Sequence, residues 1–488
     1  MRTILFTTIL AATLINSHGR AADEPGEGEV LAAMKRAATF YRDKLAVNGG
    51  YASQWPKDLS EGRTEGKKSP TIISIQPPGT TTVGLSLLRA YRATGDPLFL
   101  KQAKEAANAL VQSQLATGGW GSDFDFDPEK QKRYHLRSDL LKGDTERGKR
   151  SDYSTLDDNK TQSAMLFLLE LVNTPDAGVS DEIKEALEYA WDRLIHYQAP
   201  NGAWPQQYSS ASNYSGAPVI PVSMPDSYPP EHPKETYVHF YTLNDNNLLQ
   251  VVKLLLRAYE LEGDERYLNS AKRCGEFLLL AQHTGPQRGW SQQYNHEMVP
   301  VWARKFEPPA VSSTETLGAV EALFELWVTT GDPRFIETVP DALKWLEDSR
   351  LESGQWARFY ELKTNRPLYC EADTYKVTYD GSNTPGHYGF KISSSLQKKI
   401  DRARKELAKD PSNIMRSRTR PLSPEEWEKQ TRELRGKVRS ALKEQTEEGY
   451  WLNGDEIDAK LFSVHLNAMA GYIEALRKAA AAEPSLRN

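Results

Sequence analysis

The chain alternates between long amphipathic segments and shorter polar connections. In the amphipathic segments, apolar residues recur every three or four positions, as Val83, Leu87 and Leu88 do. Residues at this spacing lie along one face of an α-helix, which becomes buried when the helix packs against a neighbour. A second segment with helical spacing follows closely after the first, so the pattern predicts helices in pairs. The clearest second segments are residues 103–111, 271–280 and 342–346.

A short motif joins the two predicted helices of a pair. It reads aromatic residue, three residues, Gly-Asp, two residues, aromatic residue, and its three copies contain Gly95-Asp96, Gly263-Asp264 and Gly331-Asp332. Glycine is common just past the C-terminus of a helix, and aspartate is a preferred N-cap of the next helix. The motif therefore predicts the turn of a helical hairpin.

A glycine followed by an aromatic residue closes each predicted hairpin, as in Gly118-Gly119-Trp120 and Gly289-Trp290. The tryptophan follows the turn aspartate by 24, 26 and 24 residues in the three clear copies. Repeated helical hairpins build either an open solenoid or a closed ring. Because the connections are long and rich in tryptophan, tyrosine and charged residues, we expect an all-α fold: an α/α toroid with functional loops on one rim.

The N-terminal residues have the pattern of a secretory signal peptide. Arg2 precedes a short apolar stretch, and Gly19-Arg20-Ala21 has the form of a cleavage site. We therefore expect residues 1–21 to be removed during export to the periplasm or the medium, and residues 22–488 to form a single domain. Within this domain, residues 394–442 are dense in lysine, arginine and glutamate and are expected to form a charged helical appendage.

Composition removes several classes of function. The 488 residues include 61 basic and 66 acidic ones, a net charge of −5, which argues against a nucleic-acid-binding protein. Only two cysteines are present, Cys274 and Cys370, so neither a disulfide scaffold nor a cysteine-rich zinc site fits. The sequence has no phosphate-binding glycine loop, no Gly-x-Ser-x-Gly motif and no His-Glu-x-x-His motif. No apolar run after the signal is long enough to span a membrane.

Oxygen-bearing side chains recur where the first helix of each pair begins. Counting back 19 residues from the turn residues Asp176 and Asp264 reaches Asp157, which is followed by Asp158, and Asp245. Each of these residues taken alone is explained by helix capping. Clusters at equivalent positions exceed what capping needs, because the inner helices of a toroid begin at one rim. We therefore predict that the three aspartates bind a metal ion, and oxygen ligands suit Ca²⁺.

Two arginines are candidates for binding an acidic substrate. Arg304, in Trp302-Ala303-Arg304, and Arg358, in Trp356-Ala357-Arg358, both follow predicted second helices. The guanidinium fork matches the geometry of a carboxylate. The alternative is that both arginines form surface salt bridges beside core aromatic residues.

Several of these segments resemble the pectate lyases of polysaccharide lyase family 10. The matching segments are residues 154–158, 200–206, 242–246, 302–307 and 357–367. The resemblance implies calcium-assisted β-elimination of polygalacturonate or a related polyuronate such as pectate. It implies a calcium and substrate site at Asp157 and Asp245, with Asp158 where the family usually has asparagine. It also implies that Arg304 and Arg358 hold substrate carboxylates. The further predicted substrate-binding residues are Asn244, Glu307 and Trp204.

The chain departs from the family at the catalytic base. The family has an arginine fourteen residues beyond the equivalent of Arg358, and here that position is Ala372. Because a base must come within hydrogen-bond reach of the C5 proton, another residue has to replace it. The candidates are Arg366, Lys376 and His387, which lie near this position in the sequence.

Two other functions agree with the sequence. One is a glycoside hydrolase on the same architecture, with Asp157 and Asp245 as its acid and base. The other is a calcium-dependent polyuronate-binding protein without catalysis, an alternative that Ala372 supports. The product distinguishes them, since a lyase leaves a C4–C5 double bond and consumes no water.

Overall fold

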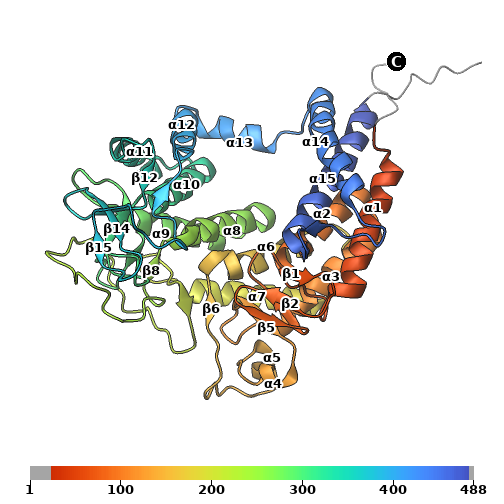
Figure 1. The fold of residues 1–488 in the computed structure, drawn as a ribbon, viewed down its shortest axis with the longest axis horizontal. Coiled ribbons are helices and arrows are strands. Elements are labelled where there is room, and N and C mark those ends of the chain that lie inside the picture. The colour runs from red at the N-terminus through yellow and green to blue at the C-terminus, as the bar shows by residue number, and fades with distance from the viewer. Residues whose placement is uncertain (1–23, 483–488) are drawn as a thin grey trace, which may run out of the picture.

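The computed structural model describes residues 24–482, and paired helices dominate it. The predicted signal peptide lies outside the described residues. The first helix of each pair packs against the first helices of the neighbouring pairs, and the second helix lies outside it (Figure 1). The chain is therefore an α/α toroid, as predicted. Its four consecutive hairpins are α2 (Thr80–Thr94) and α3 (Pro97–Ser113), α6 (Lys160–Val172) and α7 (Asp181–His196), α8 (Asn247–Glu262) and α9 (Glu265–Ala281), and α10 (Ser313–Thr330) and α11 (Val339–Asp348).

The two ends of the chain complete the toroid together. Helix α15 (Ala459–Ala482) packs against α2, and both α1 (Glu27–Phe40) and α14 (Pro424–Glu444) pack against α15. Helices α12 (Leu396–Leu407) and α13 (Pro411–Thr419) run along the top of Figure 1, between the α10–α11 side and the α14–α15 side. The charged segment 394–442, expected to form a helical appendage, thus contributes to three helices.

The Gly-Asp motif forms the hairpin turn as the sequence predicts. Gly95 ends α2 in the left-handed conformation, with φ at 73°, and its N–H donates to the carbonyl of Tyr91. The side chain of Asp96 then accepts the backbone N–H of Leu98 in α3, at 3.0 Å. Gly263 and Gly331 end α8 and α10 in the same conformation.

The tryptophan that closes each hairpin belongs to the core. Its indole N–H donates to a backbone carbonyl of the preceding helix, which ties the connection to that helix. The bonds run from Trp120 to Leu110, from Trp204 to Leu194, from Trp290 to Leu278, from Trp356 to Leu346 and from Trp451 to Ala441, at 2.6–2.9 Å. Trp204 is 0% exposed. Trp204, predicted to bind substrate, therefore has neither its ring nor its N–H exposed in this structure.

Short strands, which the hydrophobic pattern did not predict, join the hairpins at one rim. A strand just before an inner helix pairs with the strand that follows the outer helix of the same hairpin, which closes the hairpin at this rim, and the β9–β11 pair links one hairpin to the next. These pairs are β4 (Ile72–Ser74) with β5 (Asp123–Asp125), β6 (Ser154–Thr155) with β7 (Gln207–Tyr208), β8 (Tyr241–Thr242) with β10 (Gln293–Tyr294), and β11 (Ala310–Ser312) with both β9 (Trp290–Ser291) and β13 (Phe359–Glu361).

The remaining elements decorate this rim and the junction of the chain ends. Strands β14 (Pro367–Cys370) and β15 (Val377–Thr378) extend the β9–β11–β13 sheet, and β12 (Trp356–Ala357) pairs with β16 (Lys391–Ile392). The junction carries a sheet of β17 (Leu452–Asn453), β18 (Glu456–Asp458), β1 (Gln54–Pro56), β2 (Gly62–Thr64) and β3 (Lys67–Ser69). The long connection after β5 holds α4 (Pro128–Gln131) and α5 (Arg137–Leu141).

Two properties of the chain follow from this description. Cys274 and Cys370 are both buried and free, so they do not form a disulfide. Among residues 24–482, every helix is too short or too polar to cross a lipid bilayer.

Candidate active site

Two adjacent left-handed residues precede helix α6, and two more precede α8. Asp158 and Asn159 have φ at 47° and 62°, and Asp245 and Asn246 have φ at 50° and 59°. This conformation costs roughly 1–2 kcal/mol for a residue other than glycine, and aspartate and asparagine adopt it most readily. The same costly turn therefore occurs twice, at the beginning of neighbouring inner helices.

The two turns also share their hydrogen bonds. The hydroxyl of Thr155 accepts the N–H of Asp157, and the hydroxyl of Thr242 accepts the N–H of Asn244, each at 3.2 Å. This register makes Asp158 the equivalent of Asp245, and Asp157 the equivalent of Asn244. Counting 19 residues paired Asp157 with Asp245, so that count was wrong by one residue. The hairpin of α6 and α7 lacks the Gly-Asp turn, which is where the count began.

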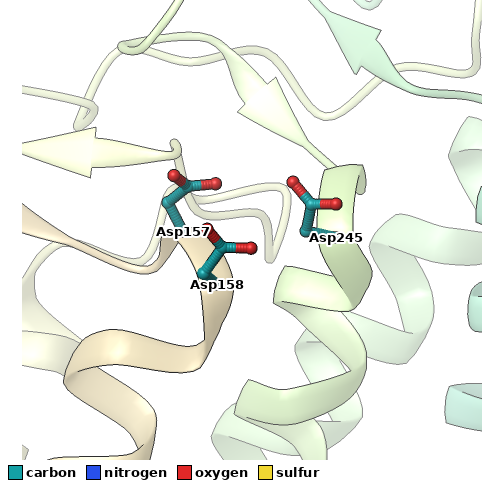
Figure 2. Close-up of side chains that lie close together, drawn as sticks. All are labelled: Asp157, Asp158 and Asp245. Carbon is teal, nitrogen blue, oxygen red and sulfur yellow. The ribbon is translucent and has the colours of Figure 1, made fainter. Parts of the chain in front are cut away.

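The turns bring the three predicted metal ligands together. Asp157, Asp158 and Asp245 each offer a carboxylate oxygen within 4.8 Å of the others. Figure 2 shows the first two extending from the beginning of one helix and Asp245 from the beginning of the next. Gln76, in the corresponding position before α2, donates to Asp158 Oδ2 at 3.3 Å. The sequence interpretation missed Gln76, although it precedes an inner helix as the aspartates do.

The neighbouring positive charges do not fully offset the repulsion among these carboxylates. Although Asp245 is exposed at the rim, burial of its carboxylate, followed by the charges of Asp158 and Asp157, raises its pKa to about 6. Burial and the charge of Asp157 also raise the pKa of Asp158. A cation between these side chains would relieve the repulsion.

The donor set fits a calcium ion. Three buried oxygens beside the cluster lack a hydrogen-bond partner among the described residues: Asp157 Oδ1, Asn244 Oδ1 and Gln76 Oε1. Carboxylate and amide oxygens are the ligands that Ca²⁺ prefers. The side-chain amide of Asn244 donates to Asp245 Oδ2 at 2.6 Å, so Asn244, predicted to bind substrate, lies within the cluster.

Arg304 is held by Glu307. The Nε and Nη2 atoms of Arg304 donate to the two oxygens of Glu307 at 2.8 and 2.6 Å. The hydroxyl of Tyr388 donates to Glu307 Oε1 at 2.8 Å. Burial opposes ionisation of Glu307, but the bonds and charge of Arg304 outweigh it and hold the pKa of Glu307 below its usual value. The Glu307 carboxylate, predicted to bind substrate, is buried and already bonded to Arg304 and Tyr388, so in this structure it positions Arg304.

Arg358 lies beside the same tyrosine. Its guanidinium carbon is 4.8 Å from the centre of the Tyr388 ring, and that of Arg304 is 5.3 Å from it. Arg358 Nη1 is 3.8 Å from Glu315 Oε1. Burial lowers the pKa of Arg358, but the charges of Glu315 and Asp245 help to raise it overall. Tyr388 therefore packs against both arginines, which pair with Glu307 and Glu315, an arrangement that the sequence interpretation missed.

Comparison with known proteins finds one matching family. The family model of the pectic acid lyases matches residues 125–355, a little under half of the chain, and this range contains the three aspartates and Arg304. The chain is a pectate lyase relative. No curated protein matches it. It is thus related to lyases that act on polysaccharide. The matched range includes the aspartates, Arg304 and Glu307, whereas Gln76, Arg358 and Tyr388 lie outside it.

Solved structures resemble the pectate lyase relative over much of its length. A family 10 polysaccharide lyase from Cellvibrio cellulosa is 19% identical, with a TM-score of 0.45, covering 67% of this chain and 96% of that one. A mutant of a family 10 lyase from the same organism, in complex with trigalacturonic acid, is 20% identical, with a TM-score of 0.44, covering 65% of this chain and 98% of that one. An α-1,6-mannanase from Salegentibacter is 12% identical, with a TM-score of 0.40, covering 92% of this chain and 99% of that one.

The three candidate bases of this pectate lyase relative lie in two different surroundings. The Arg366 guanidinium stacks over the Tyr379 ring, 3.4 Å from its centre, and Lys376 Nζ is 3.6 Å from a Glu231 oxygen. Among residues 24–482, neither side chain forms an ion pair with the three aspartates. His387 instead packs edge-on against Phe306, with ring centres 5.1 Å apart.

His387 has packing partners in common with the arginines. The guanidinium of Arg304 also packs on Phe306, at 5.1 Å from the ring centre. The next residue after His387 is Tyr388, whose ring packs against both arginines. Of the three candidates, His387 is therefore the one that shares contacts with the site.

Proposed function

We propose that this protein cleaves polygalacturonate, or a related polyuronate, by calcium-assisted β-elimination. The observation that carries the proposal is the placement of three carboxylates next to Arg304 and Arg358. A uronate carboxylate needs positive charge around it before the C5 proton becomes acidic enough to remove. The arginines supply such charge from one side, and a calcium-binding cluster lies beside them.

In this mechanism the protein orients and neutralises the substrate. Glu307 holds the Arg304 fork in place, and the Tyr388 ring packs against both Arg304 and Arg358, the two arginines that would bind substrate carboxylates. Asp157, Asp158 and Asp245 would hold calcium, and bound calcium supplies further positive charge to the substrate carboxylate. The side chains of Asn244 and Gln76 offer additional oxygens to the same cation.

His387 is the proposed base. Its ring packs against Phe306, which also packs against the Arg304 guanidinium, and histidine is the side chain that most often serves as a general base. Arg366 and Lys376 contact Tyr379 and Glu231 instead and are the alternative bases.

The arrangement of the carboxylates favours a lyase over a glycoside hydrolase. The acid and base of a glycosidase are about 5–9 Å apart, which leaves room for the sugar or a water molecule. Here three carboxylates offer oxygens within 4.8 Å of one another, which suits a shared cation.

The second candidate is a binding protein that has lost catalysis. Ala372, at the position of the family's base, is the observation that favours it. Such a protein would bind oligogalacturonate in a calcium-dependent manner and release no product.

A single set of incubations tests these functions. The purified protein is mixed with a panel of polyuronates, with calcium or with chelator, and the ultraviolet absorbance of unsaturated ends is followed. The proposal predicts absorbance with calcium only, and loss of it in His387→Ala. New reducing ends without absorbance would indicate a hydrolase, and binding without product would indicate the binding protein. Full activity in His387→Ala would reassign the base to Arg366 or Lys376, whose alanine variants complete the set.

We also propose that the protein acts outside the cytoplasm. A polyuronate is too large to enter a cell intact, and residues 1–21 have the pattern of a cleavable signal. Mass spectrometry of the exported protein should find the N-terminus at Ala22. An unprocessed Met1 on an active cytoplasmic protein would contradict this.

A further inference from the structure

Lys160 lies inside the acidic cluster. It is the first residue of α6, and its side chain is 4% exposed. Its Nζ is 3.0 Å from Asp157 Oδ2 and 3.7 Å from Asp158 Oδ2. Asn247 has the same position at the beginning of α8, so the lysine is particular to one of the two equivalent turns.

A buried ammonium group needs partners of opposite charge. Lys160 obtains them from two of the three carboxylates that would bind a divalent cation. Its positive charge therefore stabilises the cluster when the cation is absent and repels the cation when it approaches. Both effects come from one side chain, because the ammonium and the cation would share the same oxygens.

We propose that Lys160 is an internal counter-cation of this site, which keeps the cluster folded without metal and weakens its binding of Ca²⁺. The inference rests on the calcium site of the proposed function and adds the residue that tunes it. In the free protein, Ca²⁺ has to displace the ammonium from Asp157 Oδ2. The carboxylate of a bound uronate adds negative charge, so calcium binds more tightly once substrate is present.

The test compares calcium binding of the purified full-length protein and its variants in the absence of substrate. Lys160→Met removes the charge and keeps the length of the side chain. We expect this variant to bind Ca²⁺ about tenfold more tightly than the wild type in isothermal titration calorimetry. We also expect its melting temperature to be lower in chelator, and Ca²⁺ to raise that temperature more than it does in the wild type.

Three further variants make the outcome decisive. Lys160→Arg retains the charge and should bind Ca²⁺ like the wild type. Lys160→Gln is a second neutral variant, able to donate a hydrogen bond to the carboxylates, and should behave like Lys160→Met if the latter does not fold. Lys130→Met is the matched control, because Lys130 Nζ is 2.6 Å from the buried Asp125 Oδ2, away from the cluster. It should lose stability without any change in calcium binding.

Equal calcium affinity in the wild type and both neutral variants would overturn the proposal. A neutral variant that loses stability but gains no more from Ca²⁺ than the wild type does, as expected for Lys130→Met, would also overturn it, because Lys160 would then form only a structural ion pair. All readouts are taken without substrate. Failure to cleave polyuronate would therefore count against the proposed function and leave this result unaffected.

Discussion

Replacing Glu307 by glutamine should disturb the position of the Arg304 side chain while leaving the charge of Arg304 in place. Glu307 accepts hydrogen bonds from the backbone N–H, Nε and Nη2 of Arg304 and from the hydroxyl of Tyr388, at 2.6–2.9 Å. In Glu307→Gln, the new NH₂ group replaces one acceptor and cannot accept from Nη2. Hydrogen bonds to charged groups contribute about 1.5–3 kcal/mol each. Losing one and weakening the others should lower the free energy of unfolding by about 3 kcal/mol.

The effect on catalysis should be distinct from the effect on stability. The Arg304 side chain is 39% exposed. Without its carboxylate partner it can therefore turn toward water and leave the orientation in which it would bind the substrate carboxylate. We expect kcat/KM on polygalacturonate to fall about a hundredfold, as when one preorganised charge-stabilising donor is lost. Urea unfolding measures the first effect, and the absorbance of unsaturated product measures the second.

Glu170→Gln is the matched control. Glu170 is 9% exposed and pairs with Arg92 and Arg257 at 2.8 and 2.7 Å, but it lies within α6 and not at the rim. This variant should lose similar stability and retain the kcat/KM of the wild type. If Glu307→Gln also retained the wild-type kcat/KM while losing stability, the argument that Glu307 positions Arg304 would be refuted.

Three further variants test other parts of the structure. In chelator, Asp245→Asn should be more stable than the wild type above pH 6 and equally stable near pH 4. The reason is that the pKa of Asp245 is raised to about 6, so the wild type loses stability as the pH rises from 4 to 6. A difference in melting temperature that does not depend on pH would contradict this. Trp204→Phe should lower the free energy of unfolding by about 2 kcal/mol, since the hydrogen bond to Leu194 is lost. Well below the melting temperature of the variant, kcat should be unchanged. A fall in kcat would indicate that Trp204 contacts substrate. Arg358→Lys should lower kcat/KM at least about tenfold. Lysine cannot donate to the Gly389 carbonyl, as Arg358 Nε does, and at the same time bind a substrate carboxylate through two N–H groups. An unchanged kcat/KM would exclude a substrate contact.

The helical hairpins were predictable because their signals are local. Gly95 ends one helix and Asp96 caps the next, so the residues that determine the turn are adjacent in the sequence. The strands are two to four residues long and pair across connections of dozens of residues, so they leave no periodicity to detect. The tryptophan repeat was visible, but an aromatic residue in a connection is equally typical of a sugar-binding surface and of a buried anchor. Only the burial of Trp204 distinguishes the two.

The candidate site was predictable only in part. Asp157, Asp158 and Asp245 could be found because a repeat places equivalent residues at one rim. The structural register differs by one residue, because the hairpin after Asp158 lacks the Gly-Asp turn. Glu307 was interpreted as a substrate contact, although its spacing of three residues from Arg304 is also that of a local ion pair. The role of Tyr388 depends on contacts with elements distant in sequence, which a single sequence does not reveal.

The formal charges of the site explain why metal and substrate should bind together. Five carboxylates meet here, those of Asp157, Asp158, Asp245, Glu307 and Glu315, against the three cations Lys160, Arg304 and Arg358. Without metal the site therefore has an excess of two negative charges, within a chain whose net charge is −5. A polyuronate would be repelled by this excess, and one divalent cation would offset it. Since each ligand reduces the repulsion felt by the other, their binding free energies must be coupled, and by the same amount in either order of binding.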